Sequence, residues 1–211
     1  MVEAMDVAIA GEPMRLLADR ALYWPARARL LIADLHLGKA DTFRSAGIAL
    51  PRGGTAHDLA RLQRLVEATC ASSIWILGDV VHARAIETSW RQAWNAFRTR
   101  CQIPIAVVDG NHDRALRGLR LDLTLLGDGI DDGPFVLRHA PPRTPMEQHV
   151  LCGHLHPVVR LPGHGRQPAF WLRPDCTVLP AFSAFTGGHM ITPQPPDRLV
   201  LCDGSALVAL G

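Results

Sequence analysis

The stretch Ile103-Pro-Ile-Ala-Val-Val-Asp-Gly-Asn-His-Asp113 decides the fold class, because an apolar strand in it runs directly into a turn of polar residues. The same arrangement occurs twice earlier in the chain: Leu30 to Ala33 precedes Asp34, and Ile74 to Leu77 precedes Gly78-Asp79. In open α/β sheets, ligands bind beyond the carboxyl ends of the strands. We therefore expect these three turns to meet at one edge of a sheet.

The segments between these strands have helical spacing. Leu59, Leu62, Leu65 and Val66 recur with the period of a helix, for which Thr55 is the expected N-cap. A second helical stripe, whose aromatic residues we interpret as core, consists of Ile86, Trp90, Ala93, Trp94 and Phe97. Strands that alternate with helices in this way pair in parallel, with the helices outside.

The rest of the chain is read as strands and turns. Met14 to Tyr23 and Ala28 to Ala33 look extended, and from Gly133 onward short strands predict a second, mostly antiparallel or mixed sheet. These later strands are expected at residues 135–138, 149–152, 169–172, 177–179, 199–202 and 206–210. We therefore expect an α/β fold, a four-layer α/β/β/α sandwich of two mixed sheets flanked by helices.

The composition is typical of one soluble globular domain that spans residues 1–211, with 48% hydrophobic and 20% charged residues. The formal charge is only +2, so no overall field indicates nucleic-acid binding. The only lysine is Lys39, and we attribute the arginine excess to compositional bias. The planar guanidinium nevertheless suits phosphate, so a local phosphate-binding patch is an open alternative.

The cysteines and the apolar segments bear on localisation. Five cysteines lie far apart without a CxxC pair, which is typical of reduced, mostly buried thiols in a cytosolic protein. The N-terminal residues do not have the pattern of a signal peptide, and no stretch approaches 18 uninterrupted apolar residues. We therefore expect a cytoplasmic protein without a membrane partner.

Five short segments carry side chains of the types that bind metal ions. In chain order they are Asp34-Leu-His36, Gly78-Asp79, Gly110-Asn-His-Asp113, His139 and Gly153-His-Leu-His156. Carboxylate, imidazole and amide ligands suit Mn, Fe or Zn, and the lack of thiolate ligands argues against a structural zinc site. Glycine beside a ligand permits tight turns and a close approach of the backbone. One such segment would be a weak signal, but the whole ordered series predicts a two-metal site.

This series resembles the calcineurin-like metallophosphoesterase superfamily, whose pattern is DxH, GD, GNHD, a lone His and GHxH. The chain is similar to one branch in particular, the ligase-associated DNA damage response endonucleases. The stretches that carry the branch similarity are residues 34–39, 47–51 with Gly53, 153–157 and 179–188. The resemblance extends over most of the chain and implies the metallophosphoesterase form of the sandwich described above.

The resemblance also implies a role for each matching side chain. Asp79 would bridge two metal ions, His112 would donate a proton, and Asp113 would orient the loop of His112. His149 is the alternative to His139 as a ligand. The remaining ligands would be Asp34, His36 and His156 for the first ion and Asn111, His139 and His154 for the second.

The chemistry of such a site follows from general principles. Two divalent ions that share a carboxylate can clamp a phosphate ester and lower the pKa of a water, so that hydroxide attacks phosphorus in line. Protonated His112 would then neutralise the leaving oxygen. Arg114 and Lys39 lie beside ligand loops and are candidates for binding phosphate oxygens, against the alternative of a solvated or structural role.

We therefore predict a hydrolase acting on ester bonds, namely a metal-dependent phosphodiesterase or endonuclease in DNA repair. The alternatives are a small-molecule phosphatase or cyclic nucleotide phosphodiesterase with the same site, and a non-catalytic protein-binding scaffold. The expected cofactors are two divalent metal ions. Manganese is the preferred assignment, and iron, zinc or a mixed pair are the alternatives. The resemblance implies DNA or RNA as the phosphodiester substrate, and a helicase, an exonuclease and a DNA ligase as partners. The roles of His82, Asp41 and Arg44 are left open.

Overall fold

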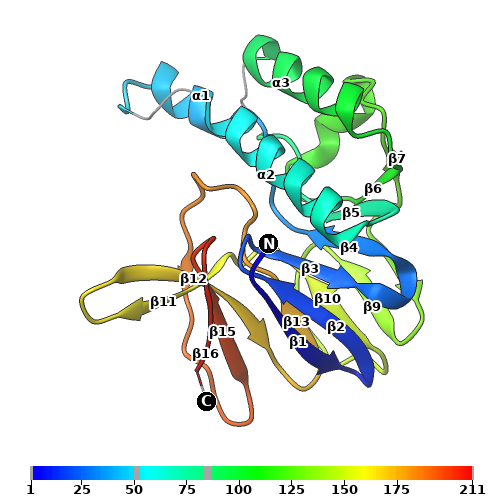
Figure 1. Cartoon of the computed structure of the whole chain (residues 1–211), viewed down its shortest axis with the longest axis vertical. Coiled ribbons are helices and arrows are strands. Elements are labelled where there is room, and N and C mark those ends of the chain that lie inside the picture. The colour runs from blue at the N-terminus through cyan, green and yellow to red at the C-terminus, as the bar shows by residue number, and fades with distance from the viewer. Residues whose placement is uncertain (1, 50–52, 83–86, 211) are drawn as a thin grey trace.

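Two β-sheets pack face to face, and helices cover the outer face of one of them (Figure 1). The computed structural model describes residues 2–49, 53–82 and 87–210, without the side chains of residues 87–89, 114, 115 and 117. The expected α/β fold with two mixed sheets is confirmed for this part of the chain, but its α-helices flank one sheet rather than both, so the expected fourth layer is absent among the described residues. Among the described residues, no helix is both long enough and apolar enough to cross a lipid bilayer.

The first sheet has seven strands in the order β1-β2-β3-β4-β5-β6-β7. Strands β1 to β4 pair antiparallel, and β4 to β7 pair in parallel. The central parallel strands are buried on both faces, which explains their continuous apolar sequences. The strands are β1 (Ala4–Ile9), β2 (Glu12–Leu17), β3 (Ala21–Trp24), β4 (Arg29–Ile32), β5 (Ser73–Leu77), β6 (Ile105–Val108) and β7 (Thr124–Leu125).

The helices follow or connect the strands of this first sheet. Its parallel strands are linked through α2 between β4 and β5, and through α3 between β5 and β6. The α-helices are α1 (Lys39–Ser45), α2 (Gly54–Thr69) and α3 (Glu87–Arg100), and the 3-10 helices are η1 (Pro25–Arg27) and η2 (Asp113–Gly118). Among the described residues, all three α-helices lie on the side of the first sheet, so the outer face of the second sheet has no α-helix of its own (Figure 1).

The second sheet has nine strands and is mixed, as expected. Its main path is β14-β11-β12-β13-β10-β9-β8, and β15 joins β12 and carries β16. Strands β9, β10 and β13 pair in parallel, whereas the other pairs except β11 with β14 are antiparallel. The strands are β8 (Gly129–Asp132), β9 (Phe135–Arg138), β10 (His149–Cys152), β11 (Pro157–Leu161), β12 (Gly165–Leu172), β13 (Cys176–Val178), β14 (His189–Met190), β15 (Arg198–Cys202) and β16 (Leu207–Leu210).

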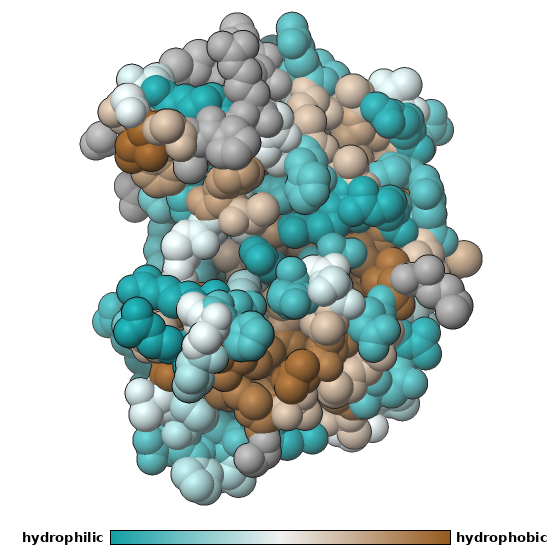
Figure 2. Space-filling view, turned by 60° about the vertical axis from the view of Figure 1, so that its left-hand side comes forward, coloured by the Kyte–Doolittle hydropathy of each residue, from teal (hydrophilic) through white to brown (hydrophobic). Residues whose placement is uncertain are grey.

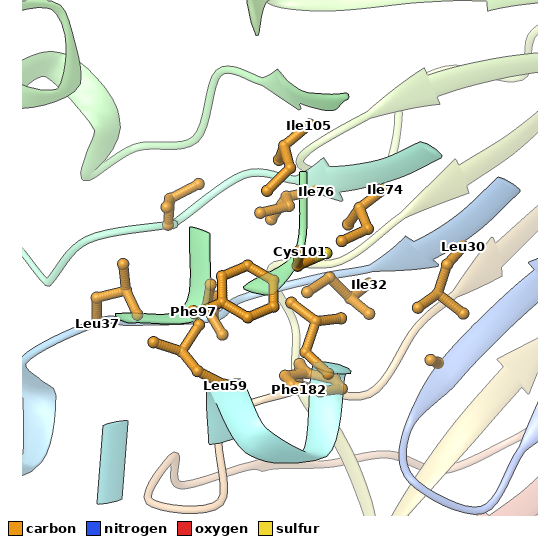
Figure 3. Close-up of a cluster of buried hydrophobic side chains, with 14 of the residues drawn as sticks. Leu30, Ile32, Leu37, Leu59, Ile74, Ile76, Phe97, Cys101, Ile105 and Phe182 are labelled. Atoms are coloured by element: carbon orange, nitrogen blue, oxygen red, sulfur yellow. The ribbon is translucent and has the colours of Figure 1, made fainter. Parts of the chain in front are cut away.

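Two apolar cores hold these layers together. On the helical side, Leu59 of α2 and Phe97 of α3 pack over Ile32, Ile76 and their neighbours in the first sheet (Figure 3). Between the sheets, the opposite face of the same strands packs against the second sheet. Buried residues on this inner face include Leu16, Leu31, Phe135, Leu151 and Phe170. The alternation of Leu30 and Ile32 with Leu31 therefore places consecutive residues in different cores.

Several sequence-based expectations need correction. Thr55 is not the N-cap of α2, because the helix begins at Gly54 and its N-cap is Gly53, which has a left-handed conformation. Oγ1 of Thr55 instead accepts a hydrogen bond from the backbone N–H of Gly38 (3.2 Å), which ties α2 to the start of α1. Strands β1, β7, β8, β11 and β14 are not predicted by the sequence patterns, and residues 14–23 form parts of two strands rather than one. Ile86 of the second helical stripe lies outside the described residues.

Candidate metal centre

The motif residues lie in loops at the carboxyl ends of strands from both sheets. Asp34 and His36 follow β4, Asp79 follows β5, and residues 109–113 follow β6. His139 follows β9, and the pair His154 and His156 follows β10. The backbone N–H groups of Asp34 and His36 donate hydrogen bonds to the carbonyl oxygens of Gly78 (3.2 Å) and Asp79 (2.9 Å). The parallel pairing of β4 and β5 therefore continues into their loops and holds the candidate ligands side by side.

Candidate ligands in these loops share an unusual backbone conformation. Left-handed φ angles are uncommon for residues with a Cβ atom and cost about 1–3 kcal/mol each. In this conformation a loop reverses within one residue, so two alternate side chains can point to the same place. The left-handed candidates are Asp34 (φ 56°), His36 (48°), Asp79 (53°), His154 (68°) and His156 (49°).

Two of the motif glycines allow the loops to approach each other closely. A Cβ atom on Gly78, whose φ is +80°, would lie 2.3 Å from Nδ1 of His139. A Cβ atom on Gly153 would lie 2.6 Å from a carboxylate oxygen of Asp34. Glycine at these two positions therefore permits close packing between the loops that carry the candidate ligands.

The first cluster consists of Asp34, His36 and His156, with one ligand atom of each within 4.8 Å of the others. Nδ1 of His156 donates a hydrogen bond to the carbonyl oxygen of Gly187 (3.1 Å), because a carbonyl can only accept. In the neutral imidazole, Nε2 of His156 then carries a lone pair, and it lies 3.2 Å from Oδ1 of Asp34. Both atoms are buried and lack a hydrogen-bond partner among the described residues. Two acceptors at this distance require a positive charge between them.

The second cluster has the same design. Asp79, His139 and His154 also bring ligand atoms within 4.8 Å of one another. Nδ1 of His139 donates to the carbonyl oxygen of Leu77 (2.9 Å), which leaves a lone pair on Nε2. This Nε2 lies 3.0 Å from Nδ1 of His154 and 3.6 Å from Oδ1 of Asp79. The side-chain nitrogen of Asn111 lies 3.3 Å from Nδ1 of His154, so the amide also reaches this cluster.

Burial favours the neutral, metal-binding form of two of these histidines, His36 and His154. Both ring nitrogens of His36 are buried without a hydrogen-bond partner among the described residues. Burial, with a smaller contribution from the nearby positive charge of Lys39, lowers the pKa of His36 to about 2. Burial also lowers the pKa of His154. Because neutral imidazoles and carboxylates direct unshared lone pairs inward, these residues fit a pair of divalent metal ions.

The loop after β6 holds the expected proton donor and its support. The side chain of His112 is 43% exposed, and its Nε2 lies 3.9 Å from Oδ2 of Asp79. Asp113 is buried, and its carboxylate accepts hydrogen bonds from the N–H groups of Val80 (2.9 Å) and Gly110 (2.9 Å). Asp113 thus joins the loop after β5 to the loop after β6, in the orienting position expected for it.

Lys39 points toward the clusters from the first turn of α1. Its ammonium lies 3.4 Å from Oγ1 of Thr186. Burial lowers the pKa of Lys39, against the opposing attraction of the Asp34 and Asp79 carboxylates. The effect of both carboxylates on Lys39 places its ammonium near the two clusters. Arg114, the other candidate for phosphate binding, has a side chain outside the described residues.

The residues whose roles the sequence leaves open have different surroundings in the structure. The ring of His82 lies 6.1 Å from that of His36 and 6.0 Å from that of His112, so His82 lines the site. Asp41 and Arg44 form an ion pair with each other on α1. Nε2 of His149 lies 2.9 Å from Oγ1 of Thr177, and its ring packs against Phe135. Among the described residues it has no place in either cluster, which includes His139 instead.

Two backbone carbonyl groups contribute to the site in addition to the side chains predicted from the sequence. The carbonyl groups of Leu77 and Gly187 accept the hydrogen bonds that orient His139 and His156. The sequence carries no signal for these acceptors, because every residue has a carbonyl group. Gly187 was noted only as part of the branch motif at residues 179–188.

The chain is similar to known proteins over most of its length. A family model described as calcineurin-like phosphoesterase matches residues 29–176. The crystal structure of the Pseudomonas putida nuclease MPE is 36% identical, with a TM-score of 0.86, and the similarity covers 99% of this chain and 100% of that one. No curated protein is significantly similar to the chain.

Two further solved structures are less similar. The E. coli phosphoesterase Yfce is 16% identical, with a TM-score of 0.49 and coverage of 86% of this chain and 96% of that one. The protein of unknown function AQ665 from Aquifex aeolicus is 18% identical, with a TM-score of 0.43 and coverage of 61% and 78%. These two similarities are too weak to support an argument.

Proposed function

Because the chain belongs to the calcineurin-like phosphoesterase family and is a hydrolase acting on ester bonds, we propose that it is a metal-dependent endonuclease that cuts DNA. The proposal takes the ester to be a phosphodiester and the physiological setting to be DNA repair. It rests on the geometry of the two clusters and on the 36% identity to a nuclease over the whole chain.

The observation that carries the proposal is the convergence of two groups of inward-facing acceptors. We assign Asp34, His36 and His156 to the first ion, and Asn111, His139 and His154 to the second, with Asp79 shared. When two divalent ions are bound, they supply Lewis acidity and an activated water as the nucleophile. The contact of 3.2 Å between Nε2 of His156 and Oδ1 of Asp34 supports this assignment, because a cation between the atoms removes their repulsion.

The other residues act on the phosphate ester itself. His112 is exposed beside Asp79, so its protonated ring can reach the leaving oxygen of a bound ester and neutralise it. Asp113 keeps the loop of His112 in place through its two hydrogen bonds to backbone N–H groups. Lys39 brings a positive charge to the site and would hold a non-bridging phosphate oxygen. Arg114 is proposed for the same role from its position next to Asp113 in the sequence.

Manganese is the proposed metal in both positions, with iron, zinc or a mixed pair as alternatives. The donors are carboxylate oxygens, imidazole nitrogens and an amide, without thiolates, which is the set that suits Mn²⁺ and Fe²⁺ as well as catalytic Zn²⁺.

The cellular context is proposed from the branch similarity. All five cysteines are free, which agrees with a reducing compartment, so we propose the cytoplasm. The proposed partners are those of a repair system, namely a helicase, an exonuclease and a DNA ligase.

Hydrolysis of bis-p-nitrophenyl phosphate, p-nitrophenyl phosphate and a labelled DNA oligonucleotide tests the function. The metal-free protein should be inactive, and added Mn²⁺ should restore cleavage of the diester and of the oligonucleotide more than of the monoester. Preference for the monoester, or for cyclic nucleotides, would make the protein a small-molecule phosphatase or phosphodiesterase. If no ester is hydrolysed with any divalent metal, the remaining alternative is a non-catalytic protein-binding scaffold.

A further inference from the structure

The hairpin of β11 and β12 extends from the metal centre to the surface. Strand β11 begins at Pro157, directly after the candidate ligand His156, and ends at Leu161. After a turn at residues 162–164, β12 returns from Gly165 along β11. The outer part of the hairpin projects away from the sheets (Figure 1). The hairpin therefore connects the metal centre with a part of the surface that lies away from the candidate ligands.

Two arginines face each other across this hairpin. Arg160 on β11 is the register partner of Arg166 on β12. Directly opposed residues of an antiparallel pair lie on one face, with Cβ atoms about 4.5–5.5 Å apart, and like charges in this position destabilise the pair. Both side chains are exposed, and neither guanidinium has a hydrogen bond or an ion pair with any described residue. The exposed Arg15, by contrast, forms an ion pair with the carboxylate of Asp6.

An acidic side chain beside the hairpin, Asp203, forms no ion pair with either arginine in the described part of the chain. Asp203 shares a small cavity with Leu161, His164 and Gln167 of the hairpin. Its Oδ1 accepts hydrogen bonds from the N–H groups of Ser205 (2.7 Å) and Ala206 (2.8 Å) in its own turn. These bonds lower the pKa of Asp203 and hold its carboxylate in that turn. The two positive charges on the hairpin are therefore left for an anion from outside the chain.

The hairpin forms one side of a hollow, and α1 forms the other. Helix α1 begins at Lys39, three residues after the candidate ligand His36, and lies on the same side of the molecule as the hairpin (Figure 1). The surface is hollowed between these two parts (Figure 2). Because a strand rises about 3.3 Å per residue, Arg160 lies roughly 13 Å along β11 from His156. That distance is too long for contact with an ester bound at the clusters, so the arginines would meet a different phosphate.

We propose that Arg160 and Arg166 together bind a backbone phosphate of the DNA strand on one side of the cleaved bond. This proposal rests on the nuclease function proposed above. A guanidinium donates paired hydrogen bonds to phosphate oxygens, and one phosphate between two guanidinium groups cancels the repulsion that the register imposes. The anchor carries no base preference, because it contacts only the backbone. Its effect is to align a polynucleotide across the metal centre, which a small diester does not need.

The test compares the variant Arg160→Gln/Arg166→Gln with wild type on two substrates. On a labelled single-stranded DNA oligonucleotide with Mn²⁺ at low salt, we expect kcat/KM to fall about tenfold. The slope of log kcat/KM against log salt should decrease by about 0.7, since one phosphate contact on a single strand contributes about that amount. On bis-p-nitrophenyl phosphate, kcat/KM should be unchanged, because that substrate is too short to reach the hairpin.

The matched control is Arg64→Gln/Arg100→Gln, which removes the same charge from exposed positions on α2 and α3. It should retain wild-type cleavage of the oligonucleotide, and Arg160→Lys/Arg166→Lys should recover most of the loss. Equal effects of the hairpin and control variants on the oligonucleotide would overturn the anchor and leave the nuclease function intact. An equal loss on both substrates would also overturn it, because the defect would then lie at the metal centre. If wild type hydrolyses the small diester but no oligonucleotide, the nuclease function fails and the anchor with it.

Discussion

At the scale of single residues, the candidate ligands combine backbone strain with electrostatic repulsion. Asp34, His36, Asp79, His154 and His156 all have left-handed backbones. In the first cluster, Nε2 of a neutral His156 also lies 3.2 Å from the carboxylate oxygen Oδ1 of Asp34, so two acceptors face each other. Strain of this kind persists only where the surroundings impose it. Here the surroundings are the loop pairing and the backbone carbonyl groups that orient His139 and His156.

His112 differs from the ligands in its exposure, and this predicts the effect of removing it. The substitution His112→Ala should lower kcat about 10²–10⁴-fold on a labelled DNA oligonucleotide, because its alkoxide leaving oxygen then departs without a proton. The bound metal, measured by mass spectrometry of the digested protein, should stay at the wild-type stoichiometry. The control is His57→Ala, because the side chain of His57 is 63% exposed on α2. Loss of metal from the His112 variant would make His112 a ligand rather than a proton donor.

At the scale of elements, the site depends on how closely the loops after the strands approach each other. The end of β5 passes the ring of His139 so closely that only glycine fits at position 78. The hydrogen bond from His139 to the carbonyl of Leu77 lies at the same point. The length and pairing of β5 therefore decide the position of an imidazole that belongs to the other sheet.

The substitution Gly78→Ala tests this contact. The added Cβ atom would lie 2.3 Å from Nδ1 of His139, so the ring has to move and the second cluster loses its geometry. We expect a loss of roughly 3 kcal/mol in the free energy of unfolding, from overpacking and left-handed strain together. The control is Gly11→Ala, where φ is +81° and nothing lies within 4 Å of the new Cβ atom.

Gly11→Ala should cost only about 1 kcal/mol, from strain alone. Urea unfolding of both variants with the metal removed measures the difference, with equal m-values as a check that the unfolded states are comparable. If the two substitutions destabilise equally, the contact with His139 does not contribute.

At the scale of the whole molecule, each ligand cluster joins the two sheets. In the first cluster, Asp34 and His36 come from the first sheet and His156 from the second. In the second cluster, Asp79 comes from the first sheet and His139 and His154 from the second. Bound ions would therefore act as cross-links between layers that are otherwise held by the apolar core.

Metal binding should accordingly stabilise the fold. At a free concentration of Mn²⁺ about 100 times Kd, one ion adds about 2.7 kcal/mol to the free energy of unfolding. For a chain of this size, that should raise Tm by roughly 5–10 °C over the chelator-treated protein in calorimetry. Asp79→Asn should abolish both the binding of the two ions and the increase in Tm, because the shared carboxylate is lost. Asp6→Asn at an exposed carboxylate should keep the shift, and a two-ion stoichiometry in the Asp79 variant would disprove sharing.

A buried ion pair adds a second link at this scale. Asp58 and Arg61 of α2 are both buried and lie 3.4 Å apart. Arg61 donates to the carbonyl oxygen of Phe182, and Asp58 accepts from the N–H of Ala184 (3.2 Å). The pair therefore anchors the segment after β13, whose residue Gly187 orients His156.

The substitution Arg61→Met should destabilise the fold by about 3–5 kcal/mol, because it leaves the Asp58 carboxylate buried without its partner. Burial already raises the pKa of Asp58 above its ordinary value of 3.8, and the loss of Arg61 removes the main opposing effect. The native variant then binds more protons than the unfolded chain above that pH, so its stability should fall from pH 5 to pH 8.

Urea unfolding at both pH values measures this slope, with Arg15→Met as the exposed control, expected within about 0.5 kcal/mol of wild type. The double variant Asp58→Asn/Arg61→Met should regain part of the loss and show little pH dependence. A single variant whose stability does not change with pH would show that Asp58 is hydrated rather than buried.

The sequence by itself determined the features that depend on local patterns. The apolar runs before Asp34, Asp79 and Asp109 predicted three parallel strands, since burial on both faces requires continuous apolar residues. The ordered polar segments predicted the members of both clusters, because loops at the carboxyl ends of parallel strands share an edge. The resemblance chose His139 over His149, and the geometry agrees.

Only the tertiary structure decided the features that depend on atoms from distant segments. The carbonyl groups that orient His139 and His156, and the carbonyl of Phe182 that accepts from Arg61, leave no mark in the sequence, because any residue can supply a carbonyl. The opposition of Arg160 and Arg166 depends on the register of a hairpin whose first strand was not expected. Strand pairing depends on segments that are far apart in the sequence. The sequence therefore identified the candidate ligands of this protein, but not the neighbouring groups that orient them.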